Sequence, residues 1–261
     1  MAGGGGIFTY RDGISVAQIV SFSVYLILAV YFRYTHRIGW FCIGVFSLLR
    51  LIGASCKLVT IRNDSQGVWA AIFVCESLGM ILIIFLLLEM LERINQVIKF
   101  VTKRIFLIPS IITWIDIGIS IAGWVAVMHV EHPLAPTPYS QTSMALLAVI
   151  YMYVVGVFIA LWRRRAEYPE EERWALTGIT ICILILAVRL VYSLIFIGSG
   201  NMAFNAIKGD PTAYLFMTML PEVAILALCA YIIAMKISPL QNKGKHVSQK
   251  LVDEESLRPL S

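Results

Sequence analysis

The chain has 261 residues, of which 59% are hydrophobic and only 14% are charged. A soluble domain of this length would need a far more polar surface. The composition therefore excludes an ordinary soluble protein and indicates an integral membrane protein. The formal net charge of +5 does not indicate nucleic-acid binding, because the basic residues follow a membrane topology.

Seven apolar stretches follow one another along the chain, each close to the ~20 residues that a helix needs to cross ~30 Å of hydrocarbon. They cover residues 13–33, 40–60, 68–91, 105–128, 140–162, 174–197 and 212–235. We predict an all-α fold, a polytopic membrane bundle of seven transmembrane helices within residues 13–237. The glycine-rich residues 1–12 are predicted to be flexible, and the polar tail 238–261 to be disordered.

Lysine and arginine are distributed unevenly between the loops. The first, third and fifth loops and the C-terminal tail hold fifteen of them, whereas the N-terminus and the other loops hold three. Since positively charged loops stay in the cytoplasm, we predict an N-terminus outside or in the lumen and a C-terminus in the cytoplasm. The expected location is the endoplasmic reticulum or the plasma membrane, as a multi-pass protein.

Charged residues interrupt five of the spans at a common depth. Counting at about 1.5 Å per residue places them in one slab, from the bilayer centre into its outer half. They are Arg50, Glu76, Asp116, Arg189 and Glu222. Charges within a membrane are costly and face the bundle interior, so we predict that all five point inward. Together with Lys57 they form three acids and three bases, the set that a structural ion-pair network requires.

The alternative to a structural network is a cavity that contains a functional acid. Burial disfavours the charged form of a carboxyl, and general-acid chemistry needs a carboxyl that holds its proton. Glu222 is the first catalytic candidate because Pro221 loosens the helix beside it, and Asp116 is the second. The aromatic residues that could face a developing cation are Trp114, Tyr192 and Tyr214.

The predicted fourth loop contains His129, Glu131 and His132, which could ligate zinc. The loop offers no clear further ligand, and its prolines suit a stiffened outer loop, so we expect no metal site. The chain has no phosphate-binding loop or nucleophile elbow, and we expect no cofactor.

Four short segments occur in a recognisable order along the chain. They are Tyr10-Arg-Asp-Gly-Ile14, Leu49-Arg-Leu-Ile-Gly-Ala54, Val188-Arg-Leu-Val-Tyr-Ser193 and Leu220-Pro-Glu222. Together they resemble a group of fungal seven-helix membrane proteins known only as a domain of unknown function, over about residues 8–237. The resemblance implies a fungal source and supplies no activity. In size and architecture the chain is also similar to fungal membrane terpene cyclases of secondary metabolism, although their Asn–Trp–Glu signature is missing.

Several functions remain open at this stage. The similarity to terpene cyclases implies an enzyme, a Brønsted-acid cyclase or isomerase acting on a lipophilic isoprenoid or epoxide. A seven-helix receptor or sensor and an exporter of lipids or small molecules are the alternatives. A retinal protein is disfavoured, because the lysine nearest to the seventh span, Lys236, lies at its cytoplasmic end. Each remaining function has the bilayer and a lipophilic small molecule as partners.

Overall fold

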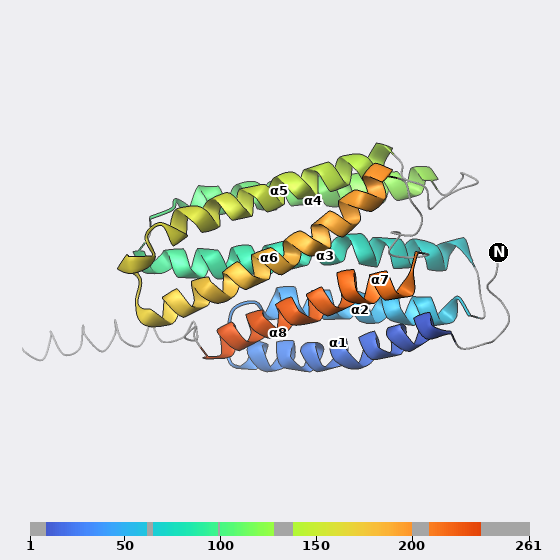
Figure 1. The fold of residues 1–261 in the computed structure, drawn as a ribbon, viewed down its shortest axis with the longest axis horizontal. Helices are drawn as coiled ribbons and strands as arrows, with labels where there is room; N and C mark the ends of the chain where they lie inside the picture. The colour runs from blue at the N-terminus through green and yellow to red at the C-terminus, as the bar shows by residue number, and fades with distance from the viewer. Residues whose placement is uncertain (1–8, 62–64, 99, 128–137, 200–208, 236–261) are drawn as a thin grey trace, which may run out of the picture.

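The computed structural model describes residues 9–61, 65–98, 100–127, 138–199 and 209–235 (Figure 1). Over these residues the fold is all-α and contains no strand, as predicted. The predicted disordered tail, residues 1–8 and the histidine-containing loop lie outside the described part of the chain. Residues 10–12, which we expected to be flexible, instead form the first turn of a helix. The Asp12 carboxylate accepts hydrogen bonds from the backbone N–H of Thr9 (2.7 Å) and from its hydroxyl (2.6 Å), which caps this helix.

Long helices occupy all seven predicted spans. The first six are α1 (Tyr10–Tyr34), α2 (Trp40–Val59), α3 (Gln66–Ile98), α4 (Lys103–Val127), α5 (Pro138–Trp162) and α6 (Glu170–Ser199). A single 3-10 turn, η1 (Arg165–Glu167), joins α5 to α6. The seventh span is a continuous rod of three pieces: α7 (Pro211–Tyr214), the π-helical segment η3 (Leu215–Met219) and α8 (Leu220–Met235).

Six of these segments are long and apolar enough to cross a membrane, judged by length and composition. They are α1, α2, most of α3, α5, α6 and the α7–η3–α8 rod. Helix α4 is not among the six, but it packs against α3 and α5 within the bundle (Figure 1). The chain is therefore a helical, multi-pass membrane protein, and a seventh crossing by α4 stays a prediction.

The outward faces of the helices are apolar. Large hydrophobic side chains such as Ile27 on α1, Trp114 on α4 and Leu184 on α6 are more than 60% exposed in the isolated chain. A protein in water would not leave such side chains uncovered on every side, whereas a bilayer covers them. The five charged residues predicted at a common depth show the opposite pattern, since all of them are buried.

Helix α4 contains a proline, and a side chain of the neighbouring helix α5 replaces the backbone hydrogen bond that this proline cannot make. Pro109 cannot donate the backbone hydrogen bond that the Ile105 carbonyl would receive from position 109. The Tyr153 hydroxyl of α5 donates to that same carbonyl at 2.8 Å. Because an unsatisfied carbonyl is costly in a membrane, this contact both completes α4 and fixes its position against α5.

We expect Tyr153→Phe to destabilise the bundle by about 1 kcal/mol or more, because the Ile105 carbonyl loses its donor. Tyr151→Phe is the matched control on the same helix. The Tyr151 hydroxyl donates to the Ile183 carbonyl at 3.1 Å, but no proline follows Ile183, so that carbonyl keeps a helical donor. The loss of stability in Tyr151→Phe should stay near the ~0.6 kcal/mol average for hydrogen bonds between membrane helices. Equal losses for the two variants in unfolding titrations would contradict this account.

The seventh rod is irregular where the sequence places Pro221. The preceding turn is π-helical, and the N–H of Leu220 donates to the Leu215 carbonyl five residues back. π-helical turns within α-helices occur frequently at functional sites. This turn lies between Tyr214 and Glu222, which are both buried, so it sets how these two side chains face relative to each other.

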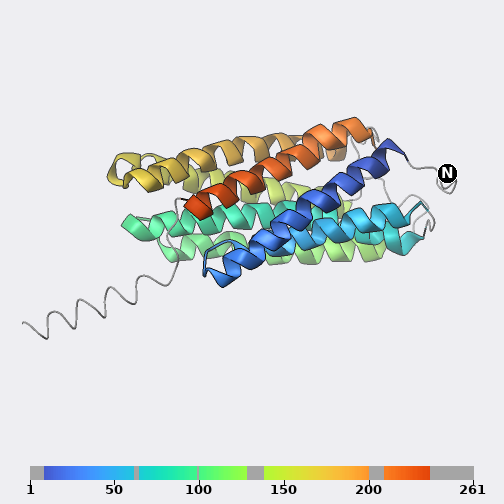
Figure 2. The same cartoon turned by 90° about the horizontal axis from the view of Figure 1, so that it is seen from below.

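The rod packs against α6 and also touches α1, which places it in the middle of one side of the bundle (Figure 2). Two hydrophobic clusters lie along its length. The larger includes Phe22, Phe46 and Leu226, and the smaller consists of Ile14, Tyr214 and Met219. Along α1, Ile14 comes before Gln18 and Phe22 after it. Gln18 therefore lies between the two clusters along α1.

Candidate functional site: a buried charged layer

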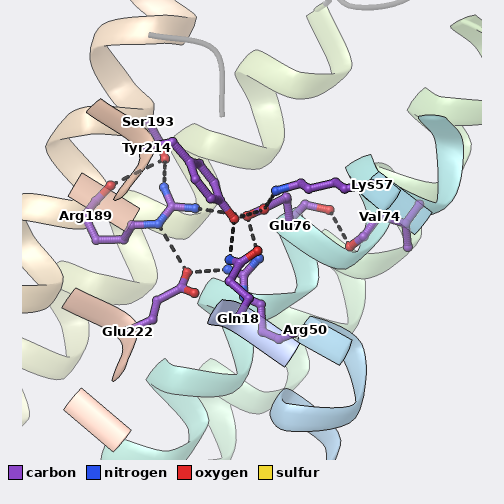
Figure 3. A network of polar contacts seen from close by, with 10 residues as sticks. Gln18, Arg50, Lys57, Val74, Glu76, Arg189, Ser193, Tyr214 and Glu222 are labelled. Atoms are coloured by element: carbon purple, nitrogen blue, oxygen red, sulfur yellow. Dashed lines mark hydrogen bonds and ion pairs between the residues drawn. The ribbon is translucent and has the colours of Figure 1, made fainter. Parts of the chain in front are cut away.

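Charged and polar side chains from five of the helical rods meet inside the bundle (Figure 3). We call this set the charged layer and define it as Gln18, Arg50, Lys57, Glu76, Arg189, Ser193, Tyr214 and Glu222. Its members lie within about 17 Å of one end of the bundle, at about 1.5 Å per residue. At this end, the N-terminal face, α1, α3 and α7 begin and α2 and α6 end. The opposite half of the bundle contains most of the larger hydrophobic cluster.

Glu76 of α3 is the acceptor that joins most of the layer. Its Oε2 accepts a hydrogen bond from Arg50 Nη1 at 2.5 Å. Its Oε1 accepts from Lys57 Nζ at 2.9 Å and from the Tyr214 hydroxyl at 2.6 Å. Arg189 Nη2 lies 3.7 Å from Oε2 and adds an ion pair. The carboxylate is thus surrounded by donors from α2, α6 and the seventh rod.

Glu222 of α8 uses only one of its two oxygens. Oε1 accepts hydrogen bonds from Arg50 Nη2 and from Arg189 Nε, the latter at 3.4 Å. Oε2 is buried and has no hydrogen-bond partner among the described residues. The side chain is fully buried, so this oxygen is an acceptor that remains open to a water, a proton or a bound molecule.

Arg50 of α2 connects the two acids. Its terminal nitrogens donate one to Glu76 and one to Glu222, while its guanidinium lies 5.3 Å from the centre of the Phe46 ring. The helix backbone of α3 makes room for it at Gly79, where an added Cβ would lie 2.8 Å from Nη2. The Nε of Arg50 has no partner among the described residues.

Tyr214 covers the layer on the N-terminal side. Its hydroxyl donates to Glu76 and accepts from Gln18 Nε2 at 2.8 Å. The ammonium of Lys57 lies 4.0 Å from the centre of its ring, a cation–π distance. On the other side, Arg189 Nη1 donates to the Ser193 hydroxyl at 2.6 Å. These contacts hold the two acids and three bases in one connected network.

The structure brings together most of the residues that the sequence predicted for the site. Arg50, Glu76, Arg189, Glu222 and Tyr214 are in direct contact within the charged layer. Tyr192 of α6 is buried, three residues from Arg189. Gln18 and Ser193 are not among the predicted site residues, and the spacing of polar residues along one helix face is the signal that points to them.

Asp116 does not join the charged layer. It is buried, as predicted, but no ion pair or hydrogen bond connects it to the layer in the described part of the chain. It lies on α4, near Ser143 of α5, with neither oxygen in hydrogen-bond geometry. The predicted balance of three acids and three bases is therefore wrong in one respect: two acids face three bases. A common depth does not bring Asp116 into the network, because α4 packs on the far side of α3 and α5.

Trp114 also lies away from the layer. Its side chain is 71% exposed in the isolated chain and points toward the surroundings of α4. The prediction that it lines the site with Tyr192 and Tyr214 is therefore wrong. The physical reason is helical rotation: Trp114 and Asp116 are two residues apart, which puts them on different faces of α4.

Among the described residues, no group of three or more His, Cys, Asp or Glu side chains is arranged to hold a metal. The candidate ligands His129, Glu131 and His132 lie outside these residues. The donors of the layer are themselves cationic, apart from Gln18, Ser193 and Tyr214, and cationic side chains favour anions over metal ions.

Two comparisons with known proteins returned nothing. No curated protein and no solved structure matches the chain. A family model, described as a domain of unknown function (DUF7702), matches residues 8–237, and this range contains the whole charged layer. The chain therefore belongs to this family of proteins with a domain of unknown function.

Proposed function

We propose that the charged layer is the binding site of a lipophilic or amphipathic small molecule within the membrane. The observation that carries this proposal is a set of buried polar atoms that no described residue satisfies: Arg50 Nε, Thr218 Oγ1 and Glu222 Oε2. Buried polar groups ordinarily have partners. Arg50 and Glu222 are paired with each other, and Thr218 is four residues from Glu222 on the same rod, at the π-helical turn.

The energetics favour function over a purely structural network. A buried ion pair stabilises a protein no better than well-packed apolar side chains of the same volume. Ionisable groups at membrane depth are by default functional. The charged layer contains five ionisable side chains in one connected network, and some of their polar atoms have no partner among the described residues. Such an arrangement suits a site that recognises a polar group of a molecule dissolved in the bilayer. A receptor, an exporter and an enzyme would each need such a site.

Photolabelling tests this proposal. A photoreactive long-chain alcohol, added to the purified protein in lipid nanodiscs, should label interior residues near Tyr214 and Thr218. Excess unlabelled alcohol should prevent this labelling. Labels confined to lipid-facing residues such as Trp114 and Leu184, with no competition, would mean that the interior admits no such molecule.

Acid catalysis is the second candidate, and two observations favour it. Glu222 Oε2 has no partner, and neither oxygen of Asp116 has one, within the described residues. A buried carboxyl with a free oxygen could give a proton to an isoprenoid epoxide, in the manner of a terpene cyclase of fungal secondary metabolism. The Oε1 of Glu222 already accepts from two guanidiniums, so only Oε2 could carry that proton.

Expression in a heterologous fungus that makes candidate prenylated epoxides would test acid catalysis. Conversion by the wild-type chain should disappear in Glu222→Gln or in Asp116→Asn while the protein level is maintained. Wild-type conversion rates in both variants would exclude this mechanism. Export of an unchanged substrate would favour the transporter, and ligand-dependent signalling would favour the receptor.

The proposed orientation makes the N-terminal face the outer or lumenal one. In intact vesicles, a tag on the C-terminus should be accessible to protease from the cytoplasmic side, and a tag on the N-terminus should be protected. The reason is the excess of lysine and arginine in the loops at the opposite end. A protected C-terminal tag would invert the topology and place the charged layer in the cytoplasmic half of the membrane.

A further inference from the structure

The charged layer is not electrically balanced. Three bases, Arg50, Lys57 and Arg189, face two acids, Glu76 and Glu222, and each of the five residues is at most 9% exposed. Each acid is shared between bases: Glu76 contacts all three, and Glu222 contacts both arginines. One positive charge therefore has no counter-charge within the layer.

The remaining buried acids of the described chain do not supply that charge. Asp116 makes no ion pair, and α4 does not pack against α2 or the seventh rod closely enough to bring it there. Asp12 caps its own helix through Thr9. An uncompensated charge buried in a low-dielectric interior is strongly unfavourable, so the layer calls for an anion that the described residues do not supply.

We infer that the molecule bound by the charged layer carries a single negative charge, a carboxylate or phosphodiester group at the end of an apolar chain. This inference rests on the proposed binding function and specifies its ligand class. One negative charge brings the net charge of three bases and two acids to zero, whereas a dianion would leave one excess negative charge. Arginine pairs well with both of these groups, and the Nε of Arg50 is a buried donor that the described residues leave unused.

The position of the charges indicates where the anion lies. The free Oε2 of Glu222 repels a negative group, so the anion belongs on the side of Arg50 and Lys57. Lys57 is only two residues from the end of α2 at the N-terminal face. Arg11, in the first turn of α1, is on the same side, but it interacts electrostatically with Asp12 and Asp210 as well as with Tyr214 and Tyr192, so Lys57 is the base left for the anion. The anion would therefore approach Lys57 from that face, while its apolar chain lies among the helices.

Thermal unfolding in nanodiscs of zwitterionic lipid tests the charge of the ligand. Oleate should raise the melting temperature by about 5 °C when its concentration is about 100 times its dissociation constant. Oleyl alcohol has the same chain without the charge and should raise it much less. Acetate has the charge without the chain and should have no effect. Phosphatidylglycerol in place of oleate distinguishes a lipid headgroup from a free acid as the source of the anion, and a rise with either supports the inference.

Variants of Lys57 test whether the stabilisation by oleate depends on the charged layer. Lys57→Met removes the excess positive charge and should abolish the rise in melting temperature caused by oleate, whereas Lys57→Arg should preserve this rise. An undiminished oleate effect in Lys57→Met would overturn the inference. So would equal effects of oleate and oleyl alcohol on the wild-type protein, or equal effects of oleate and acetate, and these comparisons do not depend on the folding of any variant.

The same measurements separate this inference from the function on which it rests. Equal stabilisation by oleate and oleyl alcohol, together with interior photolabelling, would leave the lipophilic site standing and remove only its charge preference. Absence of interior labelling, together with no stabilisation by oleate, would remove the site itself.

Discussion

Glu222→Gln is expected to lower the free energy of unfolding by about 3–5 kcal/mol, the usual loss when one partner of a buried ion pair is removed. Arg50 and Arg189 both donate to Glu222 Oε1. Glutamine preserves the shape of the side chain but removes its charge, so the excess positive charge of the layer rises from one to two. Unfolding titrations of the purified protein in mixed micelles would measure this loss.

A surface ion pair provides the control. Arg164 and Glu167 are 3.5 Å apart, and their side chains are 45% and 51% exposed. Glu167→Gln should change the stability by no more than about 1 kcal/mol, because exposed pairs contribute little. Adding Arg189→Met to Glu222→Gln removes one of the orphaned bases and should recover part of the loss. A Glu222→Gln protein as stable as the Glu167→Gln control would show that the buried contacts are not energetically coupled.

Gly79→Ala is the second substitution for which we expect a large effect, a loss of about 1–3 kcal/mol. The new Cβ would lie 2.8 Å from Arg50 Nη2 and 3.1 Å from its Cζ. The end of an arginine side chain can ordinarily move aside at little cost. Here Glu76, Glu222 and the Phe46 ring hold the guanidinium in place, so it cannot move without weakening two ion pairs.

Gly156→Ala provides a control of opposite sign. Gly156 is on α5, is exposed, and has no atom within 4 Å of the position of an added Cβ. Alanine there should stabilise the helix by roughly 0.5–1 kcal/mol, because glycine is a poor helix former. The loss at Gly79 should largely disappear in an Arg50→Met background, which a double-mutant cycle would measure. A loss that persists without Arg50 would mean that the glycine serves helix packing and not the guanidinium.

Much of this architecture can be read from the sequence. The length of an apolar stretch determines whether a helix can cross a bilayer, and the predicted span 40–60 corresponds closely to α2 (Trp40–Val59). Depth can be read in the same way, because a helix advances by a constant rise per residue. This constant rise predicts one level for Arg50, Glu76, Arg189 and Glu222, and each of them is buried in the structure.

What only the tertiary structure decided is which of these groups meet. Asp116 is predicted at the same depth as Glu76 and is also buried, yet it lies on a helix that packs outside the network, where it forms no ion pair with the layer. Trp114, two residues away on the same helix, is turned out of the bundle. Composition and spacing are properties of one helix at a time. The neighbours of a helix and its rotation about its axis depend on how all seven pack together, and that packing leaves two acids to face three bases.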